Sequence, residues 1–241
     1  MKSTDTRIVE IRAAEGGEDA RLFVADLALA YLRLALRRNW KGRATPEPNP
    51  RAGHQVLTLS FEGKGVDQLD GEAGAQRLQR VPPTERSGRV HTSTVTVSVL
   101  KADAGASEQS LYLQRGPSDF KIDWYNGTIG AGGQHHQKNA TCCRLTHLPT
   151  GIVKTSQNRS RQNSQQLAMT AMVEALDTLA ASCTQAALNG IRKAQVGSGE
   201  RAGVKRRTWR FQDDTVYDHG TGRRARAADV MRGRFELLLA A

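Results

Sequence analysis

The chain has 241 residues, of which 38% are hydrophobic, and it carries a formal net charge of +11. A chain of this length holds one or two folded domains, and a soluble protein this basic usually binds a polyanion such as nucleic acid. A membrane surface is the second candidate partner, but the sequence has no apolar run of the ~18 residues that a spanning helix needs.

The N-terminal part of the chain shows strand patterns and one helix pattern. No signal-peptide core precedes the first predicted strand, around residues 9–11, so we expect a cytoplasmic protein. Four apolar residues recur at helical spacing in a predicted amphipathic helix over residues 19–38: Phe23, Leu27, Ala30 and Leu34. Apolar residues alternate with Ser and Thr over residues 57–61 and 95–99, which predicts two more strands.

The middle of the chain begins with a predicted surface loop and a short strand at residues 111–113. Residues 115–119 contain Gly and Pro and are interpreted as a linker to a second domain. Alternation predicts a strand over residues 120–124. A hairpin follows a glycine-rich loop, with strands at residues 143–147 and 152–155.

Two helices are predicted in the C-terminal part. The first covers residues 164–189 and ends at Gly190, a typical stop residue. Its predicted buried face consists of four residues: Met172, Leu176, Leu179 and Cys183. Residues 195–203 are rich in glycine and predicted to be mobile. The second helix covers residues 227–239, with a predicted buried face of Met231, Phe235 and Leu238.

Neither a disulfide nor a metal site is expected. The cysteines are Cys142, Cys143 and Cys183, an odd number without a Cys-x-x-Cys spacing. His135 and His136 are adjacent, so their side chains diverge and do not converge on a metal. We predict no metal and no cofactor.

The segment Gly130–His135 contains the most informative motif, Gly132-Gly133-Gln134. Glycine lacks Cβ, so the backbone can take positive φ values and approach another molecule closely. The backbone N–H of Gln134 can then donate to an oxygen on which charge develops during ester hydrolysis, and its side chain can orient one water. The alternative is an ordinary flexible surface loop.

This motif, the segment Arg144–Val153 and Gln157 together resemble the catalytic domain of the class I peptide-chain release factors. The resemblance implies that the chain binds the ribosome and triggers hydrolysis of the ester between a finished peptide and its tRNA. It names Gly132, Gly133 and Gln134 as catalytic. It also implies methylation of the Gln134 side-chain amide by a glutamine methyltransferase.

The segments Val9–Glu18 and Gln79–Ser93 are similar to the family's codon-reading domain. The family's Pro-x-Thr loop, which reads UAA and UAG, is matched by Pro82-Pro83-Thr84. The resemblance implies the following codon-recognition residues: Gly16, Gly17, Asp19, Gln79, Pro82, Pro83, Thr84, His91 and Thr92. In the family, the glycine tip approaches the first base, the histidine stacks on a base, and the positions of Gln79 and Thr92 lie near the third base.

Eight basic residues are candidate contacts to ribosomal RNA phosphates: Lys138, Arg144, Lys154, Arg159, Arg161, Lys205, Arg206 and Arg207. The first five flank the glycine motif in sequence. The alternative for the basic residues near the C-terminus is a solvated surface.

The resemblance implies an α+β protein with three parts. Residues 1–116 form a mixed-sheet codon-recognition domain, residues 117–195 form a β-hairpin and long-helix hydrolysis domain, and residues 196–241 pack back on the first part. The chain begins where the family's codon-recognition domain begins, so we expect the family's N-terminal helical domain to be absent. We also expect a monomer without a membrane partner.

The sequence departs from the family pattern at Gly74–Arg77 and at His135-His136-Gln137. These departures keep two alternatives open. One is a ribosome-rescue hydrolase that acts without a stop codon, although known rescue factors lack a reading loop. The other is a non-catalytic RNA-binding protein, which the intact Gly132-Gly133-Gln134 disfavours.

Overall fold

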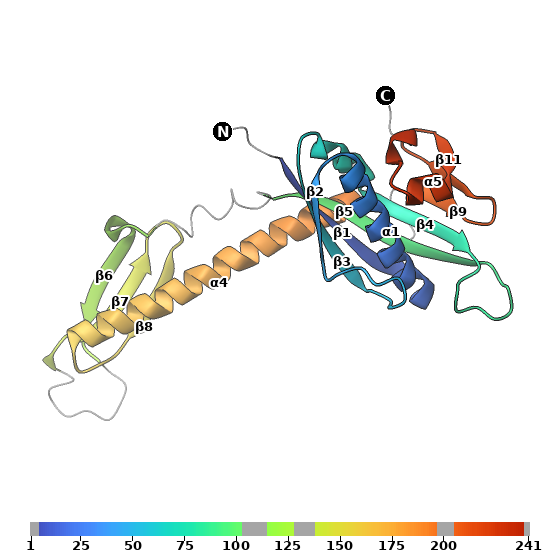
Figure 1. The fold of residues 1–241 in the computed structure, drawn as a ribbon. Helices are drawn as coiled ribbons and strands as arrows, with labels where there is room; N and C mark the ends of the chain where they lie inside the picture. Colours follow the sequence, from blue (N-terminus) through green and yellow to red (C-terminus); the bar gives the residue numbers. More distant parts are fainter. Residues whose placement is uncertain (1–4, 103–114, 128–137, 197–204, 239–241) are drawn as a thin grey trace. The chain divides into compact units, whose positions relative to one another are not determined.

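The computed structural model describes residues 5–102, 115–127, 138–196 and 205–238. The chain forms two compact units, a first unit of Met1–Ala102 with Asn189–Ala241 and a second unit of Asp103–Leu188 (Figure 1). The strand predicted at residues 111–113 lies outside the described residues. The three functional domains stay a prediction.

The first unit is built on one eight-stranded sheet with the order β11-β10-β9-β4-β5-β1-β3-β2. Its strands are β1 (Thr6–Glu15), β2 (Lys41–Thr45), β3 (Val56–Glu62), β4 (Gly74–Arg80), β5 (His91–Lys101), β9 (Lys205–Arg210), β10 (Thr215–Asp218) and β11 (Arg224–Arg226). Among these strands, β4 and β9 pair in parallel and the other neighbours are antiparallel. The C-terminal strands therefore extend the N-terminal sheet, and the predicted α+β fold with a mixed sheet is confirmed.

Helix α1 (Gly17–Arg37) packs on one face of this sheet and forms its main core (Figure 1). The predicted stripe is confirmed, because Phe23, Leu27 and Leu34 are all buried. They meet the inward residues of the strands, including Trp209 of β9, whose ring lies 5.8 Å from that of Phe23. Each such side chain contributes about 1.5–3 kcal/mol by leaving water. A short 3-10 helix, η1 (Val66–Glu72), precedes β4.

The C-terminal helix is shorter than the sequence predicts. Residues 227–239 form α5 (Ala227–Met231) and a 3-10 turn, η4 (Phe235–Leu237), instead of one helix. Gly233 separates them with a φ of +89°, and a Cβ at this position would lie 2.6 Å from the backbone nitrogen of Leu34. The chain therefore turns against α1, which still buries Phe235 and Leu238 as predicted.

The second unit consists of a three-stranded antiparallel sheet and a long helix. Its elements are η3 (Pro117–Asp119), β6 (Phe120–Tyr125), β7 (Cys142–His147), β8 (Ile152–Ser156) and α4 (Arg161–Val196), of which residues 189–196 belong to the first unit. The strand order β6-β7-β8 contains the predicted hairpin. Cys143 and Leu145 of β7 pack against α4 residues in a small separate core.

Helix α4 differs from its prediction in length and in its buried face. It continues through Gly190 to Val196, since one helical glycine costs only about 1 kcal/mol relative to alanine. Beyond it, Arg192 pairs with Glu10 at 2.6 Å, which holds the last turns in place. The buried residues follow a spacing of four: Ser164, Ala168, Met172, Leu176 and Ala180. Leu179, predicted to be buried, is 38% exposed.

No helix among the described residues is long and apolar enough to cross a bilayer.

Candidate functional site

The predicted catalytic motif belongs to the connection between β6 and β7 in the sequence. Gly132, Gly133 and Gln134 themselves lie outside the described residues, so their predicted role stays a prediction. The described residues beside this connection are joined by Arg161. Its Nε donates to the carbonyl oxygen of Ala140 at 2.7 Å, and its guanidinium carbon lies 5.1 Å from the centre of the Trp124 ring. Arg161 therefore links the start of α4 to the residues that follow the motif.

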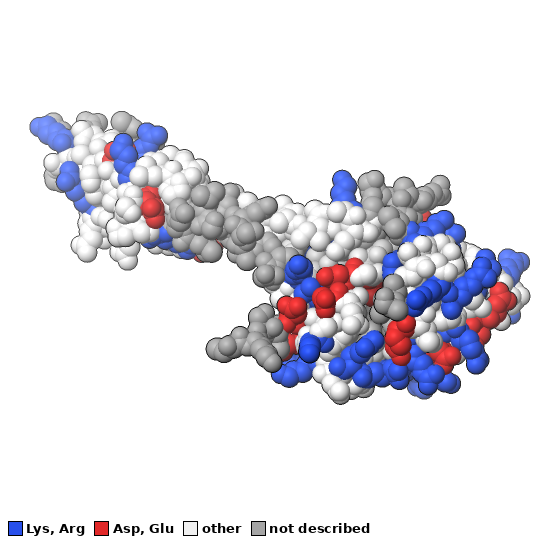
Figure 2. All heavy atoms as spheres, turned by 90° about the horizontal axis from the view of Figure 1, so that it is seen from above, with Lys and Arg blue, Asp and Glu red and all other residues white. Residues whose placement is uncertain are grey.

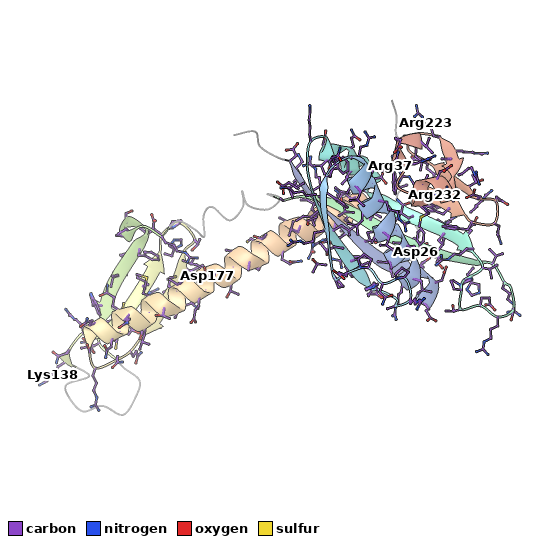
Figure 3. All side chains as sticks on the ribbon, viewed as in Figure 1. Asp26, Arg37, Lys138, Asp177, Arg223 and Arg232 are labelled. Carbon is purple, nitrogen blue, oxygen red and sulfur yellow. The ribbon has the colours of Figure 1, made fainter. Side chains whose placement is uncertain are left out.

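The basic residues near the motif do not share one surface of the second unit. Lys138, labelled in Figure 3, is exposed, as are Arg144 and Arg159. Lys154 pairs with the buried Leu145 across the β7–β8 ladder, so it leaves the sheet on the face that carries the core. Arg144 is on the opposite face. The structure thus divides the predicted phosphate contacts between two faces.

A β-hairpin in the first unit carries the predicted reading loop. Strands β4 and β5 pair directly, with Gln79 opposite Thr92 and Arg80 opposite His91. Residues 81–90 connect them, and a turn is closed by the Glu85 N–H, which donates to the carbonyl oxygen of Pro82 at 3.0 Å.

The reading-loop residues differ in exposure. Pro82 is buried at the base of the loop, whereas Pro83, Thr84, His91 and Thr92 are exposed. The antiparallel register brings together residues that are separated in the sequence. Because Thr84 is exposed in the loop, its side-chain hydroxyl can contact another molecule.

Glu85 is a residue of this loop that the sequence analysis missed. Its Oε2 lies 2.9 Å from Nε2 of His91, and its Oε1 accepts the backbone N–H of Ser87 at 2.7 Å. The Ser87 N–H, with the His91 contact, holds the pKa of the Glu85 carboxyl below its ordinary value. The carboxylate of Glu85, the residue after Thr84, therefore connects the loop to the His91 ring at the start of β5.

The start of α1 approaches the same hairpin. Gly16 has a φ of +110°, and a Cβ at this position would lie 2.3 Å from Oγ of Ser93 on β5. Only glycine fits this contact without displacing a neighbour. The glycine tip and the hairpin residues predicted to read a codon are thus adjacent, although Gly16 and His91 are far apart in the sequence.

Asp19 connects the start of α1 to both strands of the hairpin. It is 3% exposed, its Oδ1 accepts from Arg80 Nε at 2.7 Å, and its Oδ2 accepts from Ser93 Oγ at 2.9 Å. The prediction that Asp19 contacts a codon is therefore corrected. Both of its oxygens are engaged inside the protein, so Asp19 positions the tip and the hairpin.

We expect Gly16→Ala to destabilise the first unit by about 1–3 kcal/mol, because the new Cβ is strained by the positive φ and displaces Ser93. Urea unfolding followed by circular dichroism measures the loss. Gly17→Ala is the matched control, since Gly17 also has a positive φ of +59° but open space around it. Equal losses in the two variants would contradict the argument from close contact.

The C-terminal basic residues differ from their prediction. On the face shown in Figure 2, Lys and Arg gather over the first unit with Asp and Glu among them. Lys205 is exposed. Arg206 pairs with Asp218 at 3.2 Å and has a side chain 16% exposed. Arg207 is fully buried and ion-paired with Glu72 and Asp218. The prediction that Arg207 contacts RNA is therefore wrong, because no phosphate reaches it in this fold.

Comparison with known proteins places these two units in one family. The PCRF domain matches residues 2–97 and the RF-1 domain matches residues 109–220. The first match includes Gly16, Gly17 and the loop between β4 and β5, and the second includes Gly132-Gly133-Gln134. The chain belongs to the peptide chain release factor family.

The individual relatives agree with this assignment. The chain is 39% identical over 218 residues to "Peptide chain release factor 1" of Carboxydothermus hydrogenoformans, covering 89% of this chain and 59% of that protein. It is 37% identical over 236 residues to the protein of the same name from Lactobacillus helveticus, covering 96% and 63%. The solved structure of RF2 of Thermus thermophilus matches with a TM-score of 0.54 and 28% identity, covering 98% of this chain and 67% of that one. The chain spans about three fifths of the length of these curated relatives.

Proposed function

We propose that this chain is a translation termination factor that reads UAA and UAG in the ribosomal decoding site and triggers hydrolysis of the peptidyl-tRNA ester. The observation that carries the proposal is the contact of the Gly16 tip with the β4–β5 hairpin. This contact sets Gly16 against Ser93, two residues from His91, at the end of the β4–β5 ladder from which the loop with Thr84 extends. Family membership and the Gly-Gly-Gln motif support the second half of the proposal.

The reading end suits bases of single-stranded RNA. The Thr84 hydroxyl both donates and accepts hydrogen bonds, so it can satisfy a base edge. The exposed imidazole of His91 offers a face on which a splayed base stacks. Glu85 orients that ring through its 2.9 Å contact with Nε2. In our proposal Gln79 and Thr92, opposite each other in the ladder, lie near the third base.

Hydrolysis in this proposal needs no nucleophilic side chain. The two glycines let the backbone approach the ester, the Gln134 N–H donates to the developing oxyanion, and the Gln134 side chain orients the attacking water. Exposed basic residues of the second unit, such as Lys138 and Arg144, would hold the motif against ribosomal RNA. We also propose that the factor acts as a cytoplasmic monomer and that a glutamine methyltransferase modifies Gln134.

The test is peptide release from ribosomes with UAA, UAG, UGA, a sense codon or no codon in the decoding site. We expect release at UAA and UAG and little at the others. Equal release with an empty decoding site would support a rescue hydrolase instead. Ribosome binding without release at any codon would support the non-catalytic alternative.

Thr84→Ala is expected to reduce release at UAA and UAG by roughly ten- to a hundred-fold, since one specific base contact contributes about 1–3 kcal/mol. Ribosome affinity should change far less, because basic residues supply most of it. Rates at each codon, measured over a range of factor concentrations, separate the two effects. Thr58→Ala removes a hydroxyl from β3, away from the loop, and should leave the rates unchanged. An unaltered codon preference in Thr84→Ala would show that the loop does not decode.

A further inference from the structure

The outer face of the sheet continues from the reading hairpin into the C-terminal strands. The ladder aligns two rows of residues across this face. One row runs through Thr92, Gln79, Arg210, Thr215 and Arg226, and the next through Thr94, Arg77, Thr208, Tyr217 and Arg224. The residues between them in sequence, such as Leu78 and Trp209, are buried on the α1 side. Both rows are therefore polar and face away from α1.

Three arginines in these rows have no carboxylate partner within the part of the chain that the structure describes: Arg77, Arg210 and Arg224. The contrast with the inward arginines is sharp. Arg80 and Arg207 each bind two carboxylates, as expected for charges inside a protein. Outward guanidinium groups that lack internal anions are available to an external one.

A hollow of about 430 Å³ lies on this face over β9, β10 and β11. Tyr217 lines it, with the Arg224 guanidinium carbon 5.3 Å from the centre of the Tyr217 ring and the centre of the His219 ring 4.8 Å away. His219 is held by Thr208, whose Oγ1 lies 2.8 Å from its Nε2. Arg210 and one acid, Asp213, also line the hollow.

We propose that this surface, defined by Arg77, Arg210, Tyr217 and Arg224, binds the messenger RNA that follows the stop codon. Guanidinium groups beside an aromatic ring are the combination that binds single-stranded RNA, through phosphates and a stacked base. We infer messenger RNA and not ribosomal RNA because Arg210 lies in the same row of the sheet as Gln79 and Thr92. This step rests on the proposed function, in which those two residues lie near the third base. The next nucleotides then cross β9 and β10, neighbouring strands of a sheet being about 4.8 Å apart.

The test uses the full chain and ribosomes with UAA in the decoding site, on a messenger that ends after the stop codon or continues for about a dozen nucleotides. Binding is measured for the wild type and for the double variant Arg210→Gln/Arg224→Gln. On the longer messenger, we expect the double variant to bind roughly tenfold more weakly. The slope of log affinity against log salt concentration should become shallower by about two, one for each arginine. On the short messenger, the two proteins should bind alike.

The matched control is Arg38→Gln/Arg43→Gln, which removes two exposed charges from the end of α1 and from β2 at the opposite sheet edge. An equal loss in this control would overturn the proposal, since it would show a general charge effect. An equal loss on both messengers would also overturn it and place the contact on ribosomal RNA. The proposed function is tested separately, by peptide release. It fails if the wild type releases no peptide at UAA, whatever the binding assay shows.

Discussion

Replacing Gly132 or Gly133 by alanine is expected to reduce peptide release by about 10²–10³-fold, the effect of losing one preorganised oxyanion donor. Glycine is needed because a Cβ restricts the backbone and keeps it from approaching the ester closely. Ribosome affinity should stay almost unchanged, since exposed basic residues supply it. Single-turnover release at saturating factor measures the first quantity, and binding to the same complexes measures the second.

The control for this experiment is Ala131→Ser, which changes a side chain next to the motif without adding a Cβ. It should release peptide at close to the wild-type rate. Normal release by both glycine variants would refute the proposed backbone mechanism. Hydrolysis of peptidyl-tRNA free in solution would refute the dependence on the ribosome.

The elements that the sequence predicted correctly have a local signal. In α1, Phe23, Leu27 and Leu34 repeat at helical spacing, and that pattern needs no knowledge of the partner strand. Strand β4 has no such signal. Its inward positions include Gln76, which is fully buried and whose Oε1 accepts from the Trp209 indole at 2.9 Å. A polar residue at an inward position interrupts the apolar alternation, and its partner on a distant strand cannot be read from the local sequence.

The candidate site was predictable only in part, for a similar reason. Thr84 and His91 were found through their resemblance to a known loop, whereas Glu85 and Arg80 were missed. Both act through pairs across the fold, Glu85 with His91 and Arg80 with Asp19. An ion pair between separate segments leaves no periodicity in a single sequence. The same limit explains why the run Lys205–Arg207 looked like one basic patch. Lys205 is exposed, but Arg206 and Arg207 pair with Asp218, which lies on another strand, and Arg207 is fully buried.

The alternation along β9 makes Arg207 the centre of a buried ion network. Its guanidinium binds both oxygens of Glu72 and also donates from Nε to Asp218 Oδ2 at 2.9 Å. Tyr31 donates to the same Glu72 at 2.9 Å, and burial raises the pKa of this phenol well above its ordinary value. The pKa of Arg207 is also raised: burial alone would lower it, and the two carboxylates around the guanidinium outweigh that effect. The network joins η1, β9 and β10.

Arg207→Ala is expected to lower the free energy of unfolding by about 3–5 kcal/mol, because it leaves two carboxylates buried without their cation. Urea unfolding measures the loss. Arg207→Lys should also destabilise, since a lysine cannot bind Glu72 with two parallel donors and still reach Asp218. Arg226→Ala is the control, because its pair with Asp214 is exposed to solvent and such surface pairs contribute little to stability. If Arg207 contacted RNA instead, Arg207→Ala would unfold like the wild type and bind ribosomes with a weaker salt dependence, and that result would overturn the structural role.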